Sequence, residues 1–210
     1  MDKKDLKDQV ARALEIDLPY FNKPETLTSV KDYVKKNPHR PASVILCLSC
    51  PQKEDRLEDL KLLFTTRTDE MPSHAGQISF PGGRQQDEES IIDCALRENF
   101  EEVGIEKEKL EILGSMPIMP SLISRYYITP VISCFKEPLT VEKFDYNPKE
   151  VREVFLVRLG DLVSEKVFQV SDREYKGIRY PLYEFLYEDY RIWGLTAHLT
   201  ANFLKRMGLL

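Results

Sequence analysis

Short apolar segments bounded by turn residues recur along the chain and predict a protein rich in strands. The longest apolar run, 42–50, lies between prolines and is typical of a buried strand. A polar loop at 51–58 separates it from a second strand at 60–67. Further strand-like segments lie at 77–80, 109–118, 126–135 and 151–157, and the aromatic segment 175–185 predicts a last hairpin.

Helical spacing of apolar residues is confined to a few regions. Residues 1–37 have partial amphipathic spacing, which Pro24 divides in two. A helix is predicted from Glu88 to Val103 with Gly104 as its C-terminal cap. A short turn at 159–163 and a closing helix at 195–207 complete the elements. We therefore expect an α+β sandwich at 38–210, with residues 1–37 as a helical extension packed on it.

Composition and charge limit the classes of function. The chain has 210 residues, of which 42% are hydrophobic and 31% charged, as in an ordinary soluble protein. The net charge of −5 argues against a general nucleic-acid binder. No apolar run reaches the ~18 residues that a membrane helix needs, and the N-terminus has no apolar signal region. We expect no membrane or nucleic-acid partner and a cytoplasmic location.

Four cysteines raise the question of a zinc site or a disulfide. Cys47 and Cys50 form a C-x-x-C pair, but no second pair and no paired histidines complete a zinc site. His39 and His198 have no ligand spacing with the cysteines and are interpreted as structural. We expect reduced, buried thiols.

The predicted helix at 88–103 carries an unusual acidic face. Glu98, Glu101 and Glu102 are spaced i, i+3, i+4, so their Cβ atoms lie about 5–6 Å apart on one face. Like charges at that spacing repel, so the carboxylates either face bulk water or hold a cation. Oxygen-rich clusters of this kind suit Mg²⁺ or Mn²⁺.

Three other residues of this segment carry expectations. Asn99 projects into the apolar stripe of the helix, where a buried amide needs hydrogen-bond partners. We expect it to bond a nearby backbone group. Glu89 and Arg97 are eight residues apart, so they pair only if Glu89 precedes the helix or folds back.

An acidic run is ordinarily interpreted as a solvated helix face, but here the run is part of a longer sequence pattern. Seven positions match one pattern, with a random probability of about 10⁻⁸ per start site. They are Gly83, Glu89, Arg97, Glu98, Glu101, Glu102 and Gly104. This pattern is the Nudix box, and the sequence resembles a Nudix hydrolase, an enzyme that cleaves a nucleoside diphosphate linked to another group.

The resemblance implies both a fold and site roles. The family fold is an α/β/α sandwich with a mixed sheet and the box as a loop–helix–loop. By resemblance, Glu98, Glu101 and Glu102 bind the metal ions, and Glu98 also orients or deprotonates the attacking water. The turn at Gly83 would offer a backbone carbonyl to a metal, and Glu89 and Arg97 would stabilise the box.

Segments outside the box are similar to the coenzyme A pyrophosphatases of this family. These segments are 63–68 with 76–83, then 124–131, 147–155 and 192–197, so the resemblance covers roughly residues 40–205. Three departures stand out: Pro72 replaces an arginine of the upstream motif, Arg125 replaces a glycine, and Asn99 replaces an aliphatic residue or threonine. Because this arginine is missing, another dinucleotide-like molecule remains an alternative substrate.

Residues outside the helix add candidates. Arg67 ends a strand just before the box and could contact a phosphate, although a salt bridge would explain it equally. Glu150 is a second candidate for the general base. His74 lies in a loop near the box, and the aromatic residues at 180–193 suit packing or a pocket wall.

The sequence thus predicts a hydrolase dependent on Mg²⁺ or Mn²⁺ that cleaves a pyrophosphate bond, with coenzyme A or a derivative as substrate. Two alternatives are a Nudix enzyme for a nucleoside diphosphate sugar or ADP-ribose, and a non-catalytic nucleotide sensor. Sensors usually lose box carboxylates, and this chain keeps them. The expected partner is a small nucleotide-like molecule, and a homodimer is left open.

Overall fold

The computed structural model describes residues 1–16, 24–70, 75–138 and 144–210. His74 and Pro72, singled out above, lie outside these residues. The described helices are α1 (Lys3–Leu14), α2 (Pro24–Lys36), α3 (Ile91–Val103), α4 (Leu159–Leu162) and α5 (Gly194–Arg206), with single 3-10 turns at Leu57–Asp59 and Lys107–Lys109. None of them is long and apolar enough to cross a bilayer.

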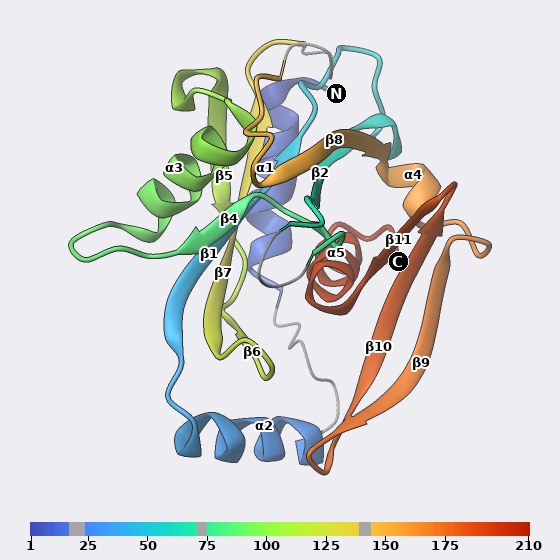
Figure 1. Ribbon diagram of the computed structural model, residues 1–210. Coiled ribbons are helices and arrows are strands. Elements are labelled where there is room, and N and C mark those ends of the chain that lie inside the picture. The colour runs from blue at the N-terminus through green and yellow to red at the C-terminus, as the bar shows by residue number, and fades with distance from the viewer. Residues whose placement is uncertain (17–23, 71–74, 139–143) are drawn as a thin grey trace.

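Two sheets form the rest of the described fold (Figure 1). The larger contains β1 (Arg40–Leu48), β2 (Lys61–Arg67), β3 (Ile78–Ser79), β4 (Gly82–Arg84), β5 (Leu110–Ser115), β6 (Met119–Ser121), β7 (Tyr126–Phe135) and β8 (Val151–Arg158). Its main order is β3-β2-β1-β7-β5. The smaller, antiparallel sheet contains β9 (Phe168–Tyr175), β10 (Ile178–Tyr187) and β11 (Tyr190–Trp193).

The larger sheet is mixed. β1 pairs with β7 in parallel over its whole length, while β2, β4, β5, β6 and β8 pair antiparallel with their neighbours. A parallel pair needs a long crossover connection, and the chain between β1 and β7 supplies it with α3. This crossover places the acidic helix against the sheet.

Alternation along β1 divides the interior into two cores. Ala42, Leu46 and Leu48 contribute to the core that α1 and α5 cover, whereas Ile45 and Cys47 contribute to the core that α3 covers. Successive strand side chains point to opposite faces, so the sheet lies between two helical layers. The predicted α+β fold, an α/β/α sandwich with a mixed sheet, is confirmed.

The two N-terminal helices contact different parts of the molecule. The buried face of α1 (Leu6, Val10, Ala13) belongs to the core shared with α5. Helix α2 packs at the tip of the β9–β10 hairpin, where Thr26 Oγ1 donates a hydrogen bond of 2.6 Å to the Arg179 carbonyl (Figure 1). Residues 1–36 therefore supply helices to two separate surfaces.

Three sequence-based boundaries were wrong. Helix α3 begins at Ile91 and not at Glu88, because Glu88 has φ +64° and Ser90 is the N-cap. The strand expected at 109–118 ends at Ser115. The hairpin expected within 175–185 instead turns at its start, since Tyr175 ends β9 and Ile178 begins β10.

Candidate active site

The site begins at a turn in which two glycines let the backbone approach closely. β4 lies antiparallel to β1, with Gly83 opposite Ser43 and Gly82 opposite Val44. A Cβ atom on Gly82 would lie 2.3 Å from the Ser43 carbonyl oxygen, and one on Gly83 would lie 2.4 Å from Glu98 Cδ. Backbone contacts leave room only for glycine at position 82, whereas a side chain at position 83 would displace the Glu98 carboxylate, which lies directly on the turn.

Local capping fixes both ends of α3. The Ser90 side chain accepts a hydrogen bond from the Asp93 backbone N–H, and Gly104 ends the helix with φ +72°. Asn99 is buried and its Nδ2 donates to the Ile105 carbonyl at 3.2 Å, which confirms the expected backbone bond. Its Oδ1 has no hydrogen-bond partner among the described residues.

Arg97 is the central cation of the box. Its Nε donates to Glu89 at 2.7 Å, and one terminal nitrogen donates to Glu98 at 2.8 Å and to Glu101 at 2.9 Å. Glu89 lies just before α3, as its predicted pairing with Arg97 requires. Hydrogen bonds from Arg97 lower the pKa of Glu89 below its ordinary value.

Among the carboxylates of α3, Glu102 is buried and Glu98 is partly buried, and desolvation is the largest influence on the pKa of each. The exposed fractions of the Glu98, Glu101 and Glu102 side chains are 16%, 51% and 4%. Desolvation raises the pKa of Glu98, and it raises the pKa of Glu102 to about 8 despite the nearby Arg67 cation. Charge on Glu98 and Glu150 raises the pKa of Glu102 further. A bound cation would favour loss of a proton from Glu98 and Glu102.

Arg67 faces Glu102 from the end of β2. Its Nη1 lies 3.7 Å from Glu102 Oε1, an ion pair that is too long for a hydrogen bond. Its Nε is buried and has no hydrogen-bond partner among the described residues. A buried guanidinium N–H of this kind can donate a hydrogen bond to an anionic ligand oxygen.

Glu150 reaches the site from a distant loop. The Asn147 N–H donates to the Glu102 carbonyl at 2.9 Å, and Asn147 Nδ2 donates to Glu150 Oε1 at 3.2 Å. The Thr68 N–H donates to the Glu150 carbonyl at 3.1 Å. These bonds hold the loop between β2 and the C-terminal end of α3. The charge of Glu150 consequently raises the pKa of both Glu98 and Glu102.

The oxygen ligands of the box suit a hard divalent cation, although the three glutamate side chains do not converge on one point. Within the described ranges, no three His, Cys, Asp or Glu side chains form a group that could hold a metal ion. Glu101 is turned to Arg97 and must be released before it can share a cation with Glu98 and Glu102. Three carboxylates and a glycine carbonyl are the oxygen ligands that Mg²⁺ and Mn²⁺ prefer, so the residues present fit such an ion.

The four cysteines carry no metal or disulfide chemistry. Cys47, Cys50, Cys94 and Cys134 are free and buried, which confirms the prediction of reduced thiols. Burial raises the pKa of Cys47 to about 12 and that of Cys134 to about 11. These thiols are therefore inert structural groups.

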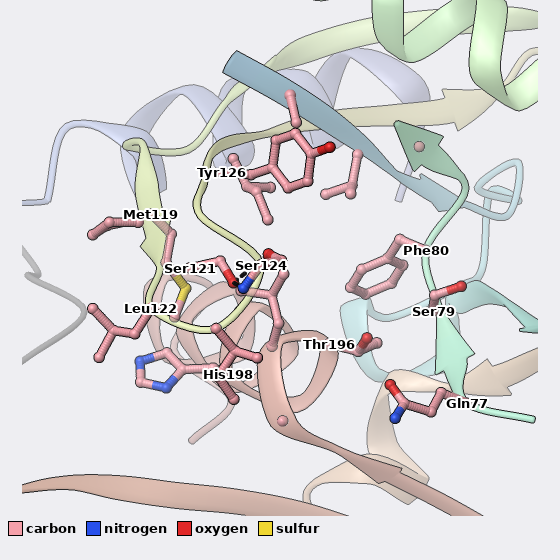
Figure 2. A pocket seen from close by; sticks show the side chains of 18 of the residues that line it. Gln77, Ser79, Phe80, Met119, Ser121, Leu122, Ser124, Tyr126, Thr196 and His198 are labelled. Carbon is pink, nitrogen blue, oxygen red and sulfur yellow. Dashed lines mark hydrogen bonds between the residues drawn. The ribbon is translucent and has the colours of Figure 1, made fainter. Parts of the chain in front are cut away.

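A pocket of about 520 Å³ adjoins the box (Figure 2). Arg67, Gly82 and Gly83 belong to its wall, which continues along β1, β3, the segment 119–124, β10 and the start of α5. Figure 2 shows Phe80 and Thr196 on one side and Met119, Leu122 and His198 on the opposite side. The pocket thus adjoins the carboxylate site through Arg67, which faces Glu102, and Gly83, which lies against Glu98.

Sequence reasoning missed most of this wall. His198 was interpreted as structural, whereas it lines the pocket and also packs against Tyr183 with ring centroids 5.0 Å apart. Of the aromatic residues suggested as a wall, Tyr180 and Trp193 line the pocket, while Phe185 lies in the core. Two motifs of the sequence, at 124–131 and 192–197, could have indicated this wall, because they contribute Tyr126 and Thr196 to it.

A glycine turn that leads into a helix of carboxylates beside a mixed sheet defines a class of phosphate-cleaving enzymes. The NUDIX domain model matches residues 38–178, about two thirds of the chain. The chain belongs to the Nudix hydrolase family, whose members generally use divalent cations and small nucleotide-like substrates.

Two relatives agree with this assignment. The chain is 35% identical over 170 residues to "Uncharacterized Nudix hydrolase NudL" of Photorhabdus laumondii, covering 80% of this chain and 86% of that protein. The protein of the same name from Yersinia pestis is 32% identical, and 81% of each chain is covered. A MutT/nudix family protein from Enterococcus faecalis has 18% identity and a TM-score of 0.48, covering 99% of this chain and 75% of its own.

Proposed function

We propose that this Nudix hydrolase cleaves the pyrophosphate bond of coenzyme A or an acyl derivative in a reaction that depends on Mg²⁺ or Mn²⁺. One observation carries the proposal. Glu102 lies 3.7 Å from the Arg67 guanidinium and Glu98 lies against Gly83, and both Arg67 and Gly83 line a pocket large enough for a substantial organic group. A substrate bound here would have its diphosphate at the carboxylates and Arg67, and one of its two organic groups in the pocket.

The metal would be held by Glu98, Glu101 and Glu102 with the Gly83 carbonyl. When bound, a divalent ion neutralises phosphoryl oxygens and lowers the pKa of a coordinated water. Arg67 binds a phosphoryl oxygen through its buried Nε, which lacks a hydrogen-bond partner in the described structure. Arg97 keeps the carboxylates aligned before the substrate arrives.

A carboxylate must accept the proton of the attacking water. Glu98 is the first candidate because desolvation raises its pKa, which makes it a stronger base than an exposed carboxylate. Glu150 is the second, since its loop is bonded to Thr68 and to the backbone of Glu102. The products expected from coenzyme A are 4′-phosphopantetheine and 3′,5′-adenosine bisphosphate.

Replacing a buried carboxylate tests the metal role. We expect Glu102→Gln to lower Mg²⁺-dependent turnover by at least about 100-fold, because a direct ligand is worth more than its supporting groups. The matched control is Glu108→Gln, an exposed carboxylate outside the box. Turnover by Glu102→Gln close to that of the control would overturn the assignment, provided that both variants unfold cooperatively.

A substrate panel tests the substrate class. Coenzyme A, an acyl derivative, ADP-ribose, a nucleoside diphosphate sugar and a dinucleoside polyphosphate are compared by kcat/KM with Mg²⁺ and with Mn²⁺. Preference for coenzyme A or its acyl form supports the proposal. Preference for another member overturns the narrower substrate, and binding without turnover of any member identifies a sensor.

A further inference from the structure

The pocket beside the box has walls that differ chemically from one end to the other. The end next to α3 contains Arg67, Arg84 and the backbone of Gly82 and Gly83. The opposite end is formed by the segment 119–124, β10 and the start of α5 (Figure 2). Arg67 lies 3.7 Å from Glu102, and Gly83 lies against Glu98, so the near end of the pocket adjoins the carboxylates. A substrate cleaved at the carboxylates can therefore extend through the pocket to its far end.

The far end is largely apolar. Met119, Leu122, Ile128, Leu182 and Leu195 supply aliphatic side chains, and Phe80 faces them from the side of the glycine turn. A polyhydroxylated sugar would lose its hydration here without regaining equivalent hydrogen bonds. An apolar chain would instead be favoured by leaving water.

Several hydroxyl groups of the wall already have partners, whereas the buried Ser43 Oγ, next to the box, has none among the described residues. Thr196 Oγ1 donates to the Ile78 carbonyl at 3.0 Å, and Ser124 Oγ donates to Ser121 Oγ at 2.6 Å. Ser79 Oγ lies 3.1 Å from Thr65 Oγ1. These groups stabilise the wall, so few of their hydrogen-bonding positions remain for reading the edge of a nucleobase.

Permanent charge is confined to one end of the described wall. Arg67 and Arg84 are its only permanently charged side chains, and no carboxylate belongs to it. The adenosine half of coenzyme A carries a 3′-phosphate, which would have no cation to pair with among the described residues at the far end. The pantetheine half carries no charge beyond the phosphate that is cleaved.

We propose that the far end of the pocket binds the pantetheine arm of the substrate with its acyl group, so that the adenosine 3′-phosphate remains outside. This assignment rests on the proposed function for the choice of substrate. Ser124, at the centre of the wall in Figure 2, and Leu182 on β10 then limit the length of acyl group that fits.

The test measures binding of each half separately and needs no turnover. In the presence of Mn²⁺, calorimetry gives Kd values for S-hexanoyl-4′-phosphopantetheine and for 3′,5′-adenosine bisphosphate. Ser124→Phe fills the pocket and should weaken binding of the acylated half by about tenfold or more, because overpacking a wall has a free-energy cost of that size. The same variant should change the Kd of the bisphosphate by less than about twofold. The matched control is Ser171→Phe on the exposed strand β9, which should change neither Kd.

A second variant guards against a folding defect in the first. Leu182→Ala enlarges the pocket, so binding should shift toward longer acyl chains, by up to about fourfold for each additional methylene buried. Loss of bisphosphate binding in Ser124→Phe with retained cooperative unfolding would assign the pocket to the nucleotide and overturn the proposal. No measurable binding of the acylated half by the wild-type protein would also overturn it.

The two proposals fail in distinguishable ways. Absence of metal-dependent hydrolysis of every diphosphate contradicts the proposed function, yet the pocket assignment stands if the acylated half binds as described. Conversely, hydrolysis of coenzyme A with equal effects of Ser124→Phe and Ser171→Phe on the acylated half leaves the function intact and rejects the pocket assignment.

Discussion

At the scale of single residues, the box is organised by one arginine, Arg97, and by a glycine, Gly83, that leaves room for a carboxylate to lie close to the backbone. Arg97 bridges Glu89, Glu98 and Glu101, so one side chain links the loop before α3 to the face of the helix. Gly83 allows the Glu98 carboxylate to lie on the turn. Arg97 and Gly83 thus position the carboxylates, and the carboxylates carry the chemistry.

Removing Arg97 should cost stability. The Arg97 side chain is 22% exposed and donates charged hydrogen bonds to three carboxylates, so Arg97→Gln should lower the free energy of unfolding by about 2 kcal/mol. Urea denaturation measures the change. Arg56→Gln is the control, because Arg56 pairs with Glu58 while 77% exposed and should shift the value by less than about 0.5 kcal/mol. Equal effects of the two variants would contradict the organising role of Arg97.

Arg125 replaces a glycine of the related motif, and its backbone shows why glycine is usual there. Its φ is +56°, in the left-handed region that costs a non-glycine residue about 1–2 kcal/mol. Glycine also loses more entropy on folding, so Arg125→Gly should stabilise the protein by a net amount of about 0.5–1 kcal/mol. Differential scanning calorimetry against Arg152→Gly, in an ordinary strand, supplies the comparison. A lower unfolding midpoint for Arg125→Gly would refute the strain argument.

At the scale of elements, β11 carries an aromatic residue that joins the two sheets. Tyr190 stacks on Phe155 of β8 with ring centroids 3.9 Å apart, and its hydroxyl donates to Glu153 at 2.7 Å. The stack and the hydrogen bond connect the smaller sheet to the strand that follows the Glu150 loop. Burial, followed by the neighbouring Glu153 carboxylate, raises the pKa of Tyr190 to about 12.

The raised pKa of Tyr190 predicts a pH dependence with a definite sign. The folded protein holds the hydroxyl proton more tightly than the unfolded chain, so this contribution to stability is complete below pH 10 and is lost as pH rises toward 12. Tyr190→Phe keeps the stack and should reduce that slope of stability against pH. Chemical denaturation over this pH range measures it, and an unchanged slope would show that Tyr190 is not the group responsible.

At the scale of the whole molecule, the sheet separates two cores and encloses the thiols between layers. Cys47 and Cys134 lie on the central strands β1 and β7, and both are completely buried. Ala42 and Val44 of β1 line the pocket from the core that α5 covers, whereas α3 covers the other core. The site is therefore assembled where the two layers meet at β4.

Thiol labelling should report global unfolding. With pKa values of about 12 and 11, Cys47 and Cys134 are protonated and inaccessible at pH 8, so iodoacetamide should modify them at least ~100-fold more slowly than an exposed thiol. A Ser171→Cys variant provides that exposed thiol, and mass spectrometry of peptides follows both rates. Comparable rates without denaturant would contradict the packing of the central strands.

The candidate site was only partly predictable from its residues. Spacing alone placed Glu98, Glu101 and Glu102 on one helical face, and the structure confirms this geometry. It could not show that Glu101 faces Arg97 while Glu102 is buried, because exposure depends on what packs against the helix. Strand β9 escaped detection because nearly all of its residues are exposed and give no period-two signal.

The sequence by itself determined the class of fold, the family and the box, since these follow from local periodicity, capping and fixed spacing. Only the tertiary structure decided what lies around the box. It brought Glu150 and Arg67 to Glu102, and it built a pocket from segments more than 150 residues apart, such as β1 and α5. The physical reason is that contacts between distant segments arise from packing in three dimensions, which no local pattern of side chains specifies.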